Sequence, residues 1–225
     1  MENYFTNAFL NRTDQEEFYK AVFLCEDSQY AKKVRQEYYR GCLKSIGENV
    51  EIGASVKIIN PQYIALGDNV RICDNATLIA RGEGGLTIGN DVILNDRVYL
   101  DTENAEGGYI KIGDHAYIGT GTTLFGHCGL EIGAYALLAQ NITITPYSHI
   151  FADPREKIIN QGGQMRKVTI GNDAYLGMHV CVMYSADIGD GSVIGAGSVV
   201  VKPIPPYCVA VGNPARVIKY RNSAR

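Results

Sequence analysis

Aliphatic residues recur at every sixth position along most of this chain. Nine Ile-Gly pairs mark the repeat between residues 46 and 195. The pattern runs without a slip through Ile170, Leu176, Val182, Ile188, Ile194 and Val200. A period of six fits neither the 3.6-residue turn of an α-helix nor the alternation of a single strand. It is typical of a short strand followed by a turn, and it predicts a parallel β-helix.

Three six-residue units would make one coil of such a β-helix, with one unit on each face. The aliphatic residue would point inward, and equivalent positions of successive coils would stack about 4.8 Å apart. The glycine that follows would relieve crowding near the corner. A β-sandwich is the alternative, but it needs a turn signal about every 8–12 residues and would not keep this phase. We therefore predict an all-β fold, a left-handed parallel β-helix of hexapeptide repeats.

Other segments flank the repeat, which covers residues 46–202. Residues 1–45 are predicted to form an N-terminal helical cap over the open end of the coil, with one helix starting at Thr13 or Asp14 and another after Ser28. Three prolines within residues 203–206 predict the end of the β-helix, because proline cannot continue the ladder.

Residues 203–225 would then form a C-terminal extension. The longest interruption of the repeat is residues 145–169. Long insertions at the corners of a solenoid are where function concentrates, so we expect an active-site loop there.

Composition narrows the class of protein. With 225 residues and 46% hydrophobic residues, the chain can bury a core without disulfides. The six cysteines are scattered without the spacing of a metal or redox motif. The N-terminus does not resemble a signal peptide, and no apolar stretch approaches the length of a membrane span. We expect a soluble cytoplasmic protein.

Charge is divided unevenly along the chain. Residues 1–144 hold 12 Lys and Arg against 19 Asp and Glu, whereas residues 145–225 hold 9 against 5. This balance indicates a local anion site in the last third of the chain. It disfavours a nucleic-acid surface, which would need a broad basic excess.

The four histidines are His115, His127, His149 and His179. Judged by local sequence alone, each is more often a surface residue than a catalyst. No two of them lie closer than twelve residues, which disfavours a zinc site built from neighbouring histidines. We expect no metal.

The C-terminal stretch carries a more specific signal. A Gly-Ala-Gly-Ser-Val-Val run, a Lys, a Pro-Pro pair and a closing Gly-Asn-Pro-Ala-Arg follow in order at 195–216. This order resembles the end of the hexapeptide-repeat acyltransferases, and most of all the maltose, galactoside and capsule or lipopolysaccharide sugar O-acetyltransferases. The unit at 168–177 also resembles the family's unit after its active-site loop, with Tyr175 where a Trp is usual. The likeness covers residues 46–219 and leaves out the N-terminal helices.

The resemblance implies an acetyl-CoA-dependent O-acetyltransferase that acts on a saccharide hydroxyl, works in polysaccharide biosynthesis and forms a homotrimer with sites between subunits. His149, followed by Asp153-Pro154-Arg155, matches the general base. The positions that match the coenzyme A channel are Met178, Ala196, Val201, Lys202, Arg216 and Lys219. Asn95 and Asp101 resemble acceptor-binding residues. Val201 stands where Thr is common and Lys219 where Arg is common, so two polar contacts of the family would be lost or weakened.

Several alternatives stay open at this point. The same histidine could serve an N-acetyltransferase of a nucleotide-linked amino sugar. A serine acetyltransferase would need a large helical N-terminal domain, and a γ-type carbonic anhydrase would need more suitably placed histidines. A non-catalytic scaffold would explain the repeat but not the loop around His149 or the C-terminal signature. The sequence does not predict the acceptor.

Overall fold

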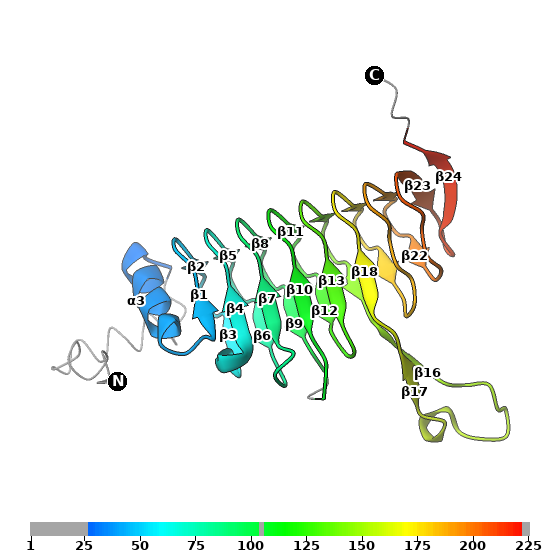
Figure 1. Ribbon diagram of the computed structural model, residues 1–225, viewed down its shortest axis with the longest axis horizontal. Helices are drawn as coiled ribbons and strands as arrows, with labels where there is room; N and C mark the ends of the chain where they lie inside the picture. The colour runs from blue at the N-terminus through cyan, green and yellow to red at the C-terminus, as the bar shows by residue number, and fades with distance from the viewer. Residues whose placement is uncertain (1–26, 104–105, 222–225) are drawn as a thin grey trace.

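The computed structural model describes residues 27–103 and 106–221 and forms a parallel β-solenoid (Figure 1). Three parallel sheets run along its length. Sheet A contains β1 (Ser45–Ile46), β4 (Ile64–Leu66), β7 (Leu86–Ile88), β10 (Ile110–Ile112), β13 (Leu130–Ile132) and β18 (Val168–Ile170). Sheet C contains β3 (Lys57–Ile59), β6 (Thr77–Ile79), β9 (Tyr99–Asp101), β12 (Thr123–Phe125), β15 (Thr143–Ile144), β20 (Cys181–Val182) and β22 (Val199–Val200).

Sheet B is the longest. It contains β2 (Glu51–Ile52), β5 (Arg71–Ile72), β8 (Ile93–Leu94), β11 (Tyr117–Ile118), β14 (Leu137–Leu138), β19 (Tyr175–Leu176), β21 (Val193–Ile194), β23 (Cys208–Val211) and β24 (Arg216–Tyr220). Its aliphatic residues stack in register, as Ile72 on Leu94 and Leu94 on Ile118 do, and they are buried. The β-helix predicted from the six-residue period is therefore confirmed.

The glycines of the Ile-Gly pairs are required by the neighbouring coil. A Cβ on Gly133 would lie 2.5 Å from the backbone nitrogen of Asn172, which belongs to the next coil along the solenoid. The Asn172 side chain accepts a hydrogen bond from Ala134 N–H at 2.9 Å. At this corner, and at those of Gly47, Gly53, Gly89 and Gly171, the missing Cβ leaves room for an Asp or Asn side chain of the next coil.

Helix α3 (Gln29–Arg40) lies at the N-terminal end of the solenoid (Figure 1). Ser28 caps it, accepting a hydrogen bond from Ala31 N–H at 3.1 Å. The buried Arg35 donates from Nε to the carbonyl of Ile52 in the first coil at 2.7 Å. The helix predicted after Ser28 is present, and the helix predicted from Thr13 or Asp14 lies outside the described residues.

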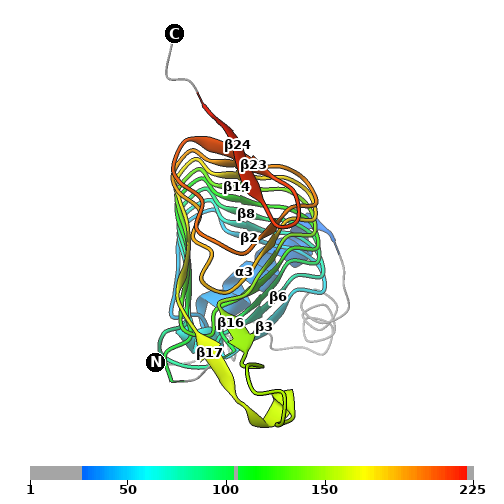
Figure 2. The same ribbon diagram turned by 90° about the vertical axis from the view of Figure 1, so that its right-hand side faces the viewer.

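The interruptions of the repeat leave the ladder in phase. A short 3₁₀ turn, η1 (Pro61–Tyr63), occupies one of them. The longest forms an antiparallel hairpin, β16 (Tyr147–His149) and β17 (Gly163–Met165), with η2 (Ile158–Asn160) in its loop. The hairpin projects from the solenoid in both views (Figures 1 and 2). The ladder resumes at Val168, inside the stretch that the sequence assigned to the loop.

The β-helix also continues past residue 202, where the prolines predicted its end. Ile204 bridges Ile188, and Ile204 N–H donates to the carbonyl of Asp187 at 2.8 Å. Strand β23 then pairs in parallel with β21, and β24 folds back on β23. The ladder tolerates the prolines because Ile204, which lies between them, supplies the required N–H group.

Candidate active site

One corner of the solenoid carries four of the nine candidate residues, namely Asp101, Val201, Lys202 and, through its hairpin, His149. We call it the C–A corner, because each coil passes there from sheet C to sheet A. It is marked by a column of residues at the ends of the sheet C strands, namely Asp101, Phe125, Thr145, Met183 and Val201. Backbone bonds continue the column: Thr145 N–H donates to Val182 O at 3.0 Å and Met183 N–H to Val200 O at 2.9 Å. The β16–β17 hairpin leaves the solenoid from this corner.

His149 lies on β16, directly opposite Gly163 in the antiparallel register, and its side chain is exposed. Tyr147 precedes it by two residues, so the two side chains lie on the same face of the strand. The phenol oxygen of Tyr147 lies 3.3 Å from Nδ1 of His149. The rings meet edge to face with centroids 5.0 Å apart. Nε2 of His149 forms no hydrogen bond with another described residue.

A row of rings connects the hairpin to earlier coils. Tyr147 lies 5.0 Å from His127 between ring centroids, and His127 lies 5.8 Å from Phe125. Tyr99 meets Phe125 edge to face at 6.2 Å. Burial lowers the pKa of His127, although the nearby carboxylates of Glu103 and Asp101 oppose that shift. Burial thus favours the neutral form of His127, which packs against the base of the hairpin.

The opposite side of the hairpin is fixed to the next coil. Arg166 follows β17 and donates from Nη1 to Ser185 Oγ at 2.8 Å. Its Nη2 pairs with Asp187 Oδ2 at 3.2 Å. The backbone N–H of Arg166 also donates to the carbonyl of Pro146 at 3.1 Å, which closes the hairpin at its base. The corner therefore holds the hairpin from both sides.

Asp101 lies at the C–A corner but is fully buried. Arg81 donates to it from Nε at 2.8 Å and from Nη2 at 2.6 Å. The Tyr99 hydroxyl donates to it at 3.0 Å and Glu103 N–H at 2.8 Å. Burial alone would raise the pKa of Asp101, but these hydrogen bonds outweigh burial and lower it.

The two residues predicted to bind the acceptor are not brought together. Asn95 lies on the corner between sheets B and C, where its side chain donates to the carbonyl of Ile118 at 3.1 Å. Asp101 lies on the C–A corner with both oxygens occupied. This geometry favours a structural role for both residues over direct contact with an acceptor, and the half-exposed Arg81 is the group that Asp101 holds in place.

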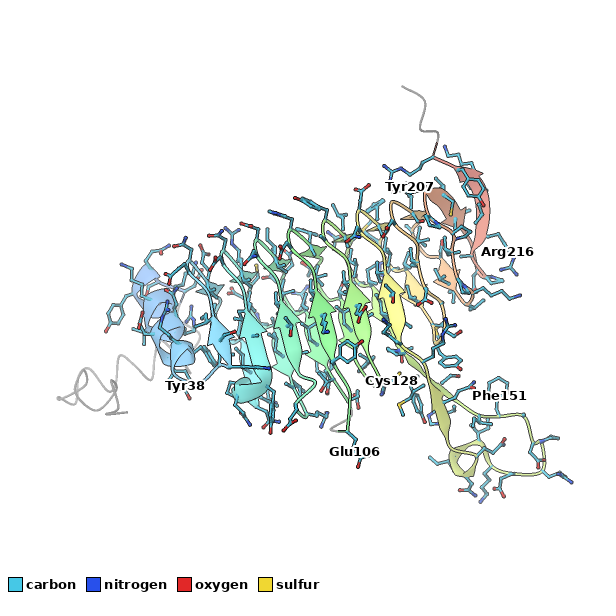
Figure 3. All side chains as sticks on the ribbon, in the orientation of Figure 1. Tyr38, Glu106, Cys128, Phe151, Tyr207 and Arg216 are labelled. Carbon is cyan, nitrogen blue, oxygen red and sulfur yellow. The ribbon has the colours of Figure 1, made fainter. Side chains whose placement is uncertain are left out.

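The residues predicted to bind coenzyme A all lie in the last coils and in the extension. Met178 and Ala196 lie on the corner between sheets B and C in consecutive coils, where Gly197 N–H donates to Met178 O at 2.8 Å. Val201 and Lys202 lie at the other border of sheet C. Strand β24 carries Arg216, labelled at the C-terminal end in Figure 3, and it also carries Lys219.

The side chains of these six residues are exposed. Within residues 27–103 and 106–221, none of the three cations among them forms an ion pair. Their charges are therefore not balanced by a carboxylate of the described residues.

Sequence reasoning missed the neighbours of His149. Tyr147 could have been found from its two-residue spacing, once residues 147–149 were assigned to a strand. His127 gave no local signal, because its contact with Tyr147 crosses from one coil to the next. Arg166 and Gly163 were part of the predicted loop but had no assigned role.

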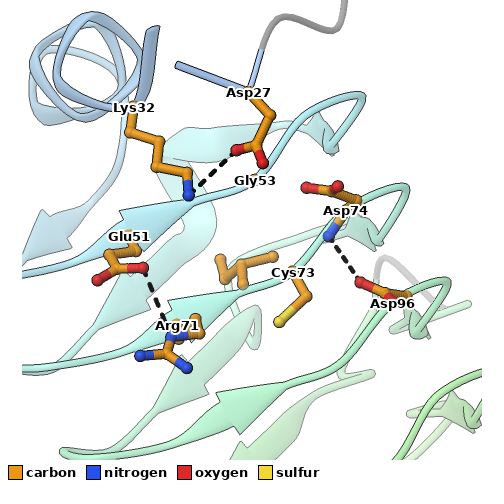
Figure 4. Close-up of a pocket in the computed structure, with 9 residues that line it drawn as sticks. Asp27, Lys32, Glu51, Gly53, Arg71, Cys73, Asp74 and Asp96 are labelled. Atoms are coloured by element: carbon orange, nitrogen blue, oxygen red, sulfur yellow. Dashed lines mark hydrogen bonds and ion pairs between the residues drawn. The ribbon is translucent and has the colours of Figure 1, made fainter. Parts of the chain in front are cut away.

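A separate pocket lies on sheet B near α3 (Figure 4). Its charged residues are largely paired with one another, as Lys32 with Asp27 at 3.1 Å and Arg71 with Glu51 at 3.5 Å. It lies at the far end of the solenoid from the hairpin (Figure 1). In the described part of the chain, no group of three or more His, Cys, Asp or Glu residues could hold a metal ion. No helix there is long and apolar enough to cross a bilayer.

Comparison with known proteins identifies the same hexapeptide repeat. Residues 167–202 match the family "Bacterial transferase hexapeptide (six repeats)", and residues 45–80 match "Hexapeptide repeat of succinyl-transferase". The chain is 36% identical to galactoside O-acetyltransferase of Escherichia coli over 138 residues, which are 60% of this chain and 64% of that protein. It is 33% identical over 170 residues to a Mycobacterium tuberculosis protein named "Probable acetyltransferase", covering 73% of this chain and 54% of that protein. The chain thus spans less than two thirds of either relative.

A solved structure of an acyltransferase is similar to this chain over most of its length. A single-site variant of AntD, an N-acyltransferase from Bacillus cereus in complex with dTDP and coenzyme A, is 25% identical to this chain. The superposition covers 84% of this chain and 90% of that one, with a TM-score of 0.59. The resemblance to hexapeptide-repeat acetyltransferases is therefore confirmed.

Proposed function

We propose that this hexapeptide-repeat protein, a relative of acetyltransferases, transfers an acetyl group from acetyl-CoA directly to a hydroxyl of a saccharide. The main observation that supports this proposal is the position of His149. Its ring is exposed on a hairpin that leaves the C–A corner just before the coils that bear Val201 and Lys202. A thioester lying along those last coils would reach an acceptor beside the hairpin.

The chemistry follows from the ring of His149. A hydroxyl is far too weak an acid to ionise beforehand, so its proton must leave as its oxygen attacks the thioester carbonyl. Nε2 of His149 accepts that proton. The tetrahedral intermediate then expels coenzyme A as a thiolate, which takes the proton back from the imidazolium. Neither a covalent cysteine nor a metal is needed.

The basic extension supports a role in binding coenzyme A. Phosphate groups pair with Lys and Arg side chains through charge-assisted hydrogen bonds. Lys202, Arg216 and Lys219 are exposed cations at the end of the solenoid that would receive the thioester. The side chains of Met178 and Ala196 border the same coils and would line the pantetheine arm.

We also propose that the protein acts as a homotrimer. In Figure 2, β24 lies across the solenoid from the hairpin, so the strand that carries Lys219 and the strand that carries His149 are on opposite sides of one chain. A site that uses both would combine residues from neighbouring copies. The outer face of sheet B also carries an apolar row along the solenoid, Ile93, Tyr117, Leu137, Tyr175 and Val193. Light scattering should give three times the 24.6 kDa chain mass.

The test is thiol release from acetyl-CoA over a panel of sugars in the wild type and in His149→Ala. Activity should vanish in the variant. The matched control is His115→Asn, because His115 occupies a left-handed turn (φ 60°) on another corner and Asn tolerates that conformation. Undiminished turnover in His149→Ala would refute the proposed base.

The second candidate is acyl transfer to the amine of a nucleotide-linked amino sugar. The likeness to AntD over most of both chains favours it. The two candidates share the base and the thioester, and they differ in the acceptor. A panel that pairs each hydroxyl sugar with its amino counterpart, free and linked to dTDP, separates them by the product formed.

A further inference from the structure

We propose that Tyr147 is a positioning residue that keeps the proton of His149 on Nδ1, and that Gly163 provides the space this contact needs. The proposal rests on the proposed function in one respect, that His149 is the base. The contact itself can be tested without activity.

The first step concerns the two ring nitrogens. A neutral imidazole carries one proton, and only its unprotonated nitrogen can act as a base. The Tyr147 hydroxyl lies 3.3 Å from Nδ1 and accepts from Nδ1–H when its own proton is directed to solvent; Nε2 then keeps its lone pair. If the proton were on Nε2, that nitrogen could not take a proton from the acceptor. A hydrogen bond at the second nitrogen is the usual means of selecting the tautomer of a catalytic histidine.

The second step concerns Gly163, which pairs with His149 across the hairpin. A Cβ at this position would overlap the phenol end of Tyr147, meeting Oη, Cζ and Cε2. Gly163 does not have the positive φ of its neighbour Gly162, which is at +77°. The glycine is therefore required for space and not for backbone conformation. The tyrosine ring crosses β17 where that strand has no side chain.

The third step concerns the other side of the tyrosine. His127 packs on the Tyr147 ring at 5.0 Å with an interplanar angle of 34°. The ring is thus held between the rings of His127 and His149 and the backbone of Gly163. Few rotamers satisfy all three contacts, which fixes the direction of the phenol oxygen.

The decisive measurement is the tautomer of His149 in the folded protein. Long-range ¹H–¹⁵N NMR spectra of histidine-labelled protein distinguish the two tautomers, and His149→Ala identifies the signals. We expect the Nδ1–H form in the wild type and a mixture in Tyr147→Phe, which keeps the ring and removes only the hydroxyl. With acetyl-CoA and an active acceptor, kcat should fall about five- to tenfold, the loss set by one neutral hydrogen bond, with KM for acetyl-CoA unchanged.

Gly163→Ala provides the second arm. It should disturb the tautomer as Tyr147→Phe does, because the added methyl group displaces the ring. In a Tyr147→Ala background the methyl group meets no ring, so Gly163→Ala should cause no further change. An unchanged tautomer in Tyr147→Phe, or additive effects of Gly163→Ala and Tyr147→Ala, would overturn the proposal. Activity retained in His149→Ala would instead refute the function while leaving the tautomer result intact.

Discussion

Arg81→Met should destabilise the protein more than Asp101→Asn, although the two changes break the same ion pair. The pair is asymmetric in its access to water. Asp101 is 0% exposed, whereas the side chain of Arg81 is 43% exposed. Removing the arginine leaves a buried carboxylate with only the Tyr99 hydroxyl and Glu103 N–H as donors. Removing the carboxylate leaves a guanidinium that water can reach.

The expected magnitudes follow from this asymmetry. A charge left buried without its partner typically costs about 3–5 kcal/mol. We expect Arg81→Met to cost about 3 kcal/mol, because two hydrogen-bond donors to the carboxylate remain. Asp101→Asn keeps the shape of the side chain, and solvent screens the remaining cation. Its cost should be about 1–2 kcal/mol.

Urea unfolding followed by circular dichroism measures both costs. Protein concentration must be held constant, because assembly would make the stability depend on it. The dependence on pH supplies an independent check. The pKa of Asp101 is lowered in the folded protein, so its stabilisation is present above the ordinary carboxyl pKa of about 4 and is lost as pH falls through the lowered value. Asparagine does not titrate, so the gap between wild type and Asp101→Asn should narrow below about pH 4.

Two results would refute this reasoning. Equal costs for the two variants would mean that exposure of the arginine does not matter. A higher KM for the acceptor in Asp101→Asn, without any loss of stability, would mean that Asp101 contacts the substrate as its sequence position suggested.

Two further predictions concern the hairpin and the core. Arg166→Met should lower kcat and speed proteolytic cleavage within residues 150–162, because the bonds to Ser185 and Asp187 are lost; the urea midpoint of the solenoid should not move, and a large shift would contradict a local role. Ile118→Ala should cost about 3 kcal/mol in the free energy of urea unfolding, since Ile118 is fully buried; a cost below about 1 kcal/mol would mean that the coil collapses around the cavity.

The fold was predictable because the repeat is local. Each six-residue unit contains the residues that specify its own strand and turn. The same pattern recurs in every coil, so it can be recognised along the whole chain. The prolines predicted the end of the β-helix too early, because the ladder of backbone hydrogen bonds needs an N–H group at only some positions. Pro203 and Pro205 flank Ile204, which alone supplies it. The number of prolines alone therefore predicts that the β-helix ends at residue 202, whereas their positions in the register allow it to continue.

The site was less predictable, although the period contained more information than the sequence reasoning used. Six residues carry the chain from one corner to the next, and three such units return it to the same corner. Asn95 and Asp101 are one unit apart, so they lie on different corners of one chain. Met178 and Ala196 are three units apart and lie on the same corner in consecutive coils. The neighbours of His149 follow no such rule, because the hairpin lies outside the repeat.

The hairpin can be long because its ends remain in the ladder. Ile144 pairs with Val182 and Ile170 pairs with Ile132, so the coils before and after it stack as if it were absent. The entropy of closing a loop grows slowly with its length, by about 0.6 kcal/mol for each doubling, so the core does not limit the insertion. An isolated two-stranded hairpin is only marginally stable in water. The direction of His149 must therefore come from side chains that fix the hairpin to the corner, Tyr147 on one strand and Arg166 beyond the other.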